Sequence, residues 1–110
     1  MLAGLGAEVL QRLADGSVPG SGERAGRLND LSVRLADLGR REEAPAAIED
    51  AVTIRRELAA ARPAVFGHRL ASSLTVLAGQ LAALGRDAEA QAASDEATRI
   101  GDLQAGVPGA

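Results

Sequence analysis

The chain has 110 residues, enough for one domain that buries a core without disulfide bonds. Hydrophobic residues make up 46% and charged residues 25%, which is the composition of a globular protein. The net charge of -3 provides no basic surface, so the sequence predicts binding neither to nucleic acid nor to an anionic membrane. Because the chain contains no cysteine, disulfides, thiolate catalysis and cysteine-ligated zinc are excluded.

The N-terminal residues Met1–Glu8 lack the basic start and long apolar run of a signal peptide. No apolar stretch in the sequence approaches the ~20 residues of a membrane span. We therefore expect a cytoplasmic protein. Aromatic residues make up only 1%, and an aliphatic core of this kind favours closely packed helices over sheets.

Apolar residues recur at helical spacing along the chain and predict five helices. These helices are expected near residues 2–15, 22–38, 41–61, 65–84 and 87–101. The first has its apolar face on Leu2, Leu5, Val9, Leu10 and Leu13. A glycine-rich connector, residues 16–22, follows it and offers Ser21 as the N-cap of the second helix.

The second and fourth expected helices each carry a row of leucines spaced by three and four residues. The rows are Leu28, Leu31, Leu35 and Leu38 in one, and Leu70, Leu74, Leu77, Leu81 and Leu84 in the other. Such spacing places each row on one helix face. Gly39 and Gly85 follow directly, where a left-handed C-cap favours glycine.

The third and fifth expected helices begin with acidic residues, which complement the positive end of a helix. Pro45 lies in the first turn of the third helix, where its missing N–H costs little. That helix should end before Pro63, because proline disfavours the helical conformation of the residue before it. After about Gly101 we expect a frayed tail.

An internal repeat is the main organisational signal. The segment from Leu35 to Ala44 reappears, at an offset of 46 residues, from Leu81 to Ala90. Across residues 35–54 and 81–100, eleven of twenty positions are identical. The shared order Leu-x-x-Leu-Gly-Arg-x-x-Glu-Ala is too specific to arise from alanine content alone. A repeat of this length predicts two helix-turn-helix units.

Each unit resembles a tetratricopeptide repeat. The matching positions are Leu28, Leu31, Ser32, Leu35, Gly39, Ala44, Ile48 and Ala51 in the first unit, and Leu74, Leu77, Ala78, Leu81, Gly85, Ala90, Ser94 and Ala97 in the second. The spacing exceeds the usual 34 residues of this family and is closer to the long, kinesin-light-chain-like variety common in actinobacterial proteins. The opening of that variety is similar to Arg27-Leu-Asn-Asp-Leu31.

The resemblance implies an all-α fold, a short helical-repeat array with two units and an additional N-terminal helix. The expected divisions are an N-terminal helix and connector (1–22), unit one (23–62), unit two (63–103) and a flexible tail (104–110). Leu35 and Leu81 replace the family's inner tyrosines, and Ser94 stands where a large apolar residue is usual. Two units are fewer than the three that usually bury a continuous core.

Candidate catalytic and metal-binding residues are few. His68 is the only histidine and lacks the partners of a catalytic triad or a metal site, so we expect it at the surface. Acidic neighbours such as Glu42 and Glu43 point about 100° apart on a helix and do not converge on one ligand. Residues 16–22 lack the Gly-Lys-Ser/Thr ending of a phosphate loop. The sequence therefore predicts no enzyme, no cofactor and no metal.

Phe66, the only aromatic residue, is expected to wedge between the two units. If it is fully buried, its replacement by alanine should cost about 3–5 kcal/mol.

The resemblance further implies a binding surface on the concave side, lined by the first helix of each unit. Positions one or two residues from the leucine rows are Asn29, Val33 and Ala36 in the first unit, and Thr75, Gly79 and Ala82 in the second. Asn29 is the leading candidate, because an exposed amide can both donate and accept hydrogen bonds from a peptide. An ordinary surface role for Asn29 remains equally open.

We interpret the chain as a protein–protein interaction module that binds a peptide or helix of unidentified sequence. The alternative is a structural unit without a separate ligand, in which the open ends of the array stack on a second copy to form a homodimer.

Overall fold

The computed structural model describes residues 20–106, and this part of the chain is all-helical. It contains α2 (Ser21–Asp37), α3 (Ala44–Ala61), α4 (Pro63–Ala83) and α5 (Asp87–Gly106), with no strand in that range. The all-α prediction is confirmed. The helix expected over 2–15 and the tail residues 107–110 lie outside the described residues.

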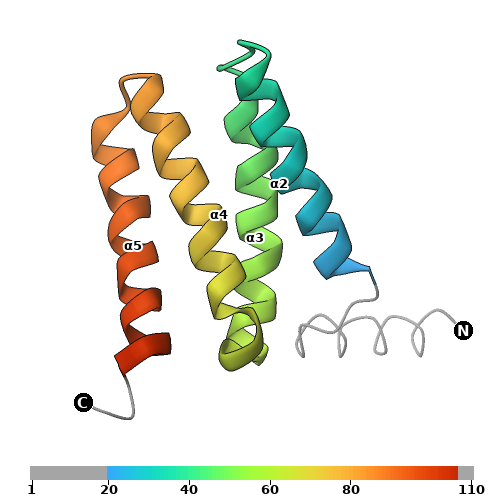
Figure 1. Cartoon of the computed structure of the whole chain (residues 1–110), viewed down its shortest axis with the longest axis vertical. Coiled ribbons are helices and arrows are strands. Elements are labelled where there is room, and N and C mark those ends of the chain that lie inside the picture. Colours follow the sequence, from blue (N-terminus) through green and yellow to red (C-terminus); the bar gives the residue numbers. More distant parts are fainter. Residues whose placement is uncertain (1–19, 107–110) are drawn as a thin grey trace, which may run out of the picture.

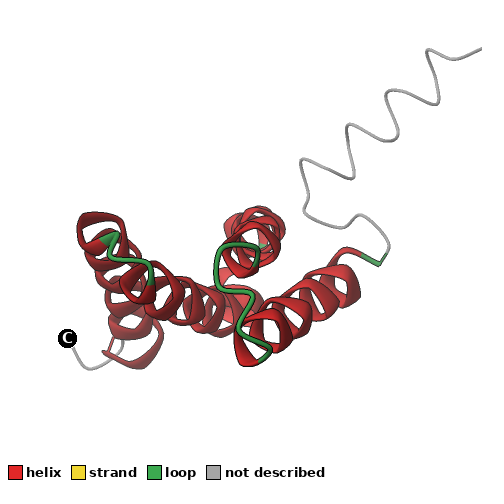
Figure 2. Ribbon diagram, turned by 90° about the horizontal axis from the view of Figure 1, so that it is seen from above, coloured by secondary structure: helices red, strands yellow, loops and turns green. Residues whose placement is uncertain are grey.

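The four helices form an open array of two helix-turn-helix units. Each helix packs on the next one in the chain, α2 and α4 touch only slightly, and α2 does not reach α5. In Figure 1 the α2–α3 and α4–α5 loops lie at one end, and the α3–α4 junction lies at the other. The view from above shows that the helices follow one another in a zigzag and do not close into a bundle (Figure 2).

The turn inside each unit explains the glycine of the repeat. Gly39 and Gly85 have φ of 81° and 78°, a left-handed conformation that costs glycine little. The N–H of Arg40 donates to the carbonyl oxygen of Leu35 at 2.8 Å, and the N–H of Arg86 donates to that of Leu81 at 2.9 Å. Both helices therefore end in the same Schellman motif, in which the last carbonyls find donors.

The repeated segment also has an arginine, a glutamate and an alanine in common, and these residues lie near the start of the following helix. Arg40 forms an ion pair with Glu43 at 2.6 Å, and Arg86 forms the equivalent pair with Glu89 at 2.6 Å. The hydrogen bond from Arg86 lowers the pKa of Glu89 below its ordinary value. The next residue of each unit, Ala44 or Ala90, is buried. The repeated sequence is thus a repeated turn with the same bonds.

We expect Gly85→Ala to destabilise the protein by about 1–2 kcal/mol, because a side chain disfavours the left-handed backbone. The control is Gly79→Ala within α4. An added Cβ at Gly79 meets nothing within 4 Å. Since alanine is the better helix former, this control should raise stability by about 0.5–1 kcal/mol. Urea denaturation of both variants measures the difference, and equal stabilities would contradict the role assigned to the turn.

The core lies along the interfaces between successive helices and is built from aliphatic residues. Its largest members come from α3 and α4, and it contains no aromatic side chain. The buried cluster consists of Ala25, Ile48, Ala51, Val52, Leu70, Leu74, Leu77, Leu81, Ala90 and Ala93. Small residues at many of these positions allow the helix backbones to approach closely.

Three predicted helix ends are wrong. Ser21 is the first residue of α2 and makes no capping bond, and Gly20 precedes it with φ of 78°. Residues 41–43 form a turn, so α3 begins at Ala44 rather than at residue 41. The helix α5 continues past Gly101 to Gly106. The side-chain amide of Gln104 donates to the carbonyl oxygen of Pro63 at 2.9 Å, which attaches the end of α5 to the start of α4.

Phe66 does not act as a wedge. Its side chain is only half-buried, and it is not part of the core cluster or of the partly buried residues packed against that cluster. The loss of about 3–5 kcal/mol for Phe66→Ala was expected only for a fully buried side chain, so it does not apply. Leucines from α4 occupy the space between the units instead.

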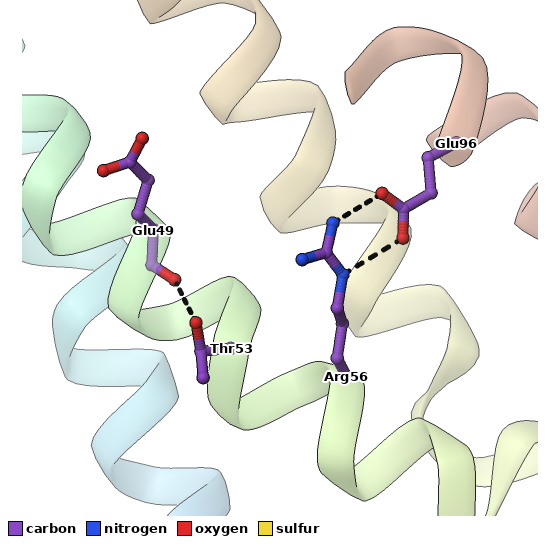
Figure 3. Close-up of polar contacts among 4 residues, drawn as sticks. All are labelled: Glu49, Thr53, Arg56 and Glu96. Carbon is purple, nitrogen blue, oxygen red and sulfur yellow. Dashed lines mark hydrogen bonds and ion pairs between the residues drawn. The ribbon is translucent and has the colours of Figure 1, made fainter. Parts of the chain in front are cut away.

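One ion pair connects α3 with α5. Arg56 binds Glu96 through two hydrogen bonds of 2.6 and 3.2 Å, as Figure 3 shows together with the local bond from Thr53 to the carbonyl of Glu49. Both side chains of the pair are partly exposed, so the surrounding water screens their attraction. The pair links the second helices of the two units without contact between their backbones.

Candidate functional site

A groove of about 280 Å³ lies between α2 and α4, the first helices of the two units. It occurs there because these helices both pack on α3 but touch each other only slightly. The lining residues come from the C-terminal halves of α2 and α4 and from the turn after α2. They are Val33, Ala36, Asp37, Arg41, Thr75, Val76, Gly79, Gln80 and Ala83.

Four of the six predicted site residues line this groove, namely Val33, Ala36, Thr75 and Gly79. Sequence reasoning missed the neighbouring positions Val76, Gln80 and Ala83. The signal was present in the leucine row of α4. Leu74 and Leu81 are buried, and the residues two positions beyond them, 76 and 83, line the groove, whereas the prediction took Thr75 and Ala82, one position beyond the same leucines.

Ala82 lies elsewhere. It lines a neighbouring depression between α4 and α5, together with Asp87 and Gln91. Gly79 lines both depressions, so Ala82 lies next to the groove but on the α5 side of α4.

Asn29 is not an exposed amide. Its side chain is half-buried, and Oδ1 accepts a hydrogen bond from Ser73 Oγ at 2.9 Å. Arg55 Nη1 lies 3.4 Å from the same oxygen and 2.6 Å from Ser73 Oγ. The acceptor that was expected to meet a peptide is thus used within the protein. Asn29 belongs to the interface between α2, α3 and α4 and not to the groove.

Arg55 is the centre of this interior network and carries an unusual charge. It is only 8% exposed, and the described residues place no carboxylate within ion-pair distance of it. Its other partner is the carbonyl oxygen of Arg69 at 3.3 Å. Burial lowers the pKa of Arg55, the nearby charge of Arg69 lowers it further, and Asp30 opposes the shift. An arginine nevertheless remains protonated in a protein, so the buried charge persists.

The groove is apolar at its walls and polar at its margin. Val33, Ala36, Val76 and Ala83 contribute aliphatic surface, while Asp37 is exposed on the last turn of α2. The hydroxyl of Thr75 donates to the carbonyl oxygen of Ala71 at 2.9 Å. Such a lining provides contact area and shape but no strong nucleophile or acid–base pair.

Two further contacts hold the groove in place. Ser32 Oγ is buried, 2.6 Å from the carbonyl oxygen of Ala44 and 2.9 Å from Gln80 Oε1. This hydroxyl connects α2 with the first residue of α3 and with α4. The contact with Ala44 is buried, and the part-buried contact with Gln80 joins the two groove walls. Polar contacts away from water are sensitive to substitution.

Gly79 leaves the α4 wall without a side chain. It has ordinary helical φ, and a Cβ there would meet nothing within 4 Å. The fold itself does not require glycine at this position. A Cβ can therefore be added at this position without a clash, and a larger side chain attached to it starts in open space.

His68 is exposed, as the sequence predicts. Across residues 20–106, no three His, Asp or Glu side chains gather closely enough to bind a metal ion. None of the four described helices is long and apolar enough to cross a membrane.

Comparisons with known protein families, curated proteins and solved structures find no match for this chain.

Proposed function

We propose that the protein is an interaction module of the tetratricopeptide type, and that the groove between α2 and α4 holds a peptide or helix of a partner protein. The observation that supports the proposal is the composition of the groove. Two units contribute one wall each, the walls are aliphatic, and Gly79 leaves room for the close approach of another backbone.

The chemistry of the walls indicates what the partner segment is. Small aliphatic residues with few free polar groups suit one or two apolar side chains on a helix face, with polar residues at the margin near Asp37 and Arg41. The groove is short, so we expect modest affinity, in the range of transient complexes.

Gly79→Trp tests the groove directly. We expect the indole to fill it and to lower the affinity of peptides that were selected on the unmodified protein from a displayed random library, by at least about tenfold, or about 1.4 kcal/mol. Because the position is open, the variant should keep its thermal stability. Fluorescence anisotropy with labelled selected peptides measures the affinity.

The matched control is Glu57→Trp, which places the same side chain at an exposed position of α3 that does not line the groove. Selected peptides should bind this control as they bind the unmodified protein. If Gly79→Trp and Glu57→Trp bind the peptides equally well, the groove is not the binding site and the proposal fails.

A further inference from the structure

The outer face of α2 carries two exposed leucines, Leu31 and Leu38. Leu31 lies among the charged residues Arg27, Asp30 and Arg34. At the 46-residue offset, the residue equivalent to Leu31 is Leu77 in α4, and the two differ sharply in burial. Leu31 is 48% exposed, whereas Leu77 is 8% exposed. Leu38 is 73% exposed, whereas the equivalent Leu84 is half-buried. The α4 positions are covered because α3 of the preceding unit packs on that helix.

The same interface can be followed from the α3 side. Ile48, Val52 and Arg55 are buried, and Arg55 bonds directly to Ser73 of α4. Their equivalents in α5 begin with Ser94 and Thr98, which are polar and exposed. The α5 end of the array is therefore built to face water, as terminal repeats usually are, and the α2 end is not.

The sequence before α2 has an apolar pattern similar to that by which α3 covers α4. The same offset relates Ile48, Val52, Arg55 and Ala59 of α3 to a row of uncharged, mostly apolar residues, of which only Leu13 is larger than its α3 equivalent. That row is Leu2, Gly6, Val9 and Leu13.

The other side of the segment is polar. Ile54 and Leu58 of α3 do not share the row that faces α4, and their equivalents are Glu8 and Arg12. The segment is thus apolar on one side only. This pattern suits a helix with a single neighbour in the array.

We propose that residues 2–13 of this chain dock on the outer face of α2 as α3 docks on α4, and so cover the two exposed leucines of that face. The constant offset leaves the same length of chain between the two partners in both cases, so the segment can reach the face. An attached segment also has an effective concentration that a second copy reaches only at high protein concentration.

The chain contains no cysteine, so a pair of introduced thiols can report the docking. Arg55 and Ser73, in contact at 2.6 Å, correspond to Val9 and Arg27. The test pair is Val9→Cys with Arg27→Cys in the full chain, treated with a short thiol-to-thiol cross-linker in dilute solution. The control pair is Ala7→Cys with Arg27→Cys, since residues two apart on a helix point in nearly opposite directions.

We expect the test pair to cross-link within one chain at least about tenfold faster than the control pair, because docking raises the effective concentration of the two thiols. Adding Leu31→Asp should reduce the rate to that of the control, whereas adding Leu103→Asp, at an exposed position of α5, should leave it unchanged. Equal rates for the two pairs overturn the proposal. So does cross-linking mainly between chains, which assigns the face to a second copy.

Discussion

Leu74→Ala should lower the free energy of unfolding by about 2–5 kcal/mol, since it removes a large buried side chain and leaves a cavity. Leu74 is 0% exposed and is one of the largest fully buried side chains in the described part of the chain. It belongs to the central cluster that joins α3 and α4. A domain of this size has only about 5–15 kcal/mol of stability, so the loss is a large share of the total.

Chemical denaturation with circular dichroism measures this loss. The control is Leu103→Ala on α5, where the leucine is exposed and its truncation should change stability by less than about 0.5 kcal/mol. A Leu74→Ala protein as stable as the Leu103→Ala protein would contradict the central position of the α3–α4 interface.

Arg55→Met should leave stability unchanged or raise it by up to about 4 kcal/mol, because it replaces a buried charge by an apolar side chain of similar length. The groups left behind stay satisfied, since Ser73 Oγ still donates to Asn29 Oδ1 at 2.9 Å. Ser73→Ala should have the opposite effect. It removes the shortest bond of the guanidinium, 2.6 Å, and should cost about 1–3 kcal/mol.

The two substitutions can be combined to test the cause. If the cost of Ser73→Ala arises from an unsatisfied Arg55, that cost should largely disappear in the Arg55→Met background. Urea midpoints of the four proteins measure the coupling. A loss of stability in Arg55→Met as large as that in Ser73→Ala would show that the buried arginine stabilises the fold.

The features that local chemistry determines were predictable from the sequence. Gly39 and Gly85 follow leucine rows and need a left-handed backbone, and both adopt it. Pro63 ends α3 at Ala61, because Arg62 cannot stay helical before it. Each of these outcomes depends on residues only a few positions apart, so a single sequence carries enough information.

The features that depend on distant residues were not predictable in the same way. Asn29 is half-buried because Arg55 and Ser73, 26 and 44 positions away, bond to it. The extension of α5 involves Gln104 and Pro63, 41 positions apart. Helical periodicity placed four of the predicted site residues on the side that lines the groove, but the groove's full lining depends on how far α4 is rotated against α3.

Most of the packing in this array is between helices that follow one another in the chain, and this determines how a disturbance spreads through the molecule. Because α2 and α5 do not touch, a change at one can influence the other only through the helices between them or through the pair of Arg56 and Glu96. The main route passes through α3 and α4, and a second one uses the few direct contacts between α2 and α4. The stability of such an array is approximately a sum over successive interfaces. A ligand in the groove contacts both sides of the α2–α4 junction. It therefore strengthens the slight contact that α2 and α4 already make, and makes the two units more cooperative than they are without the ligand.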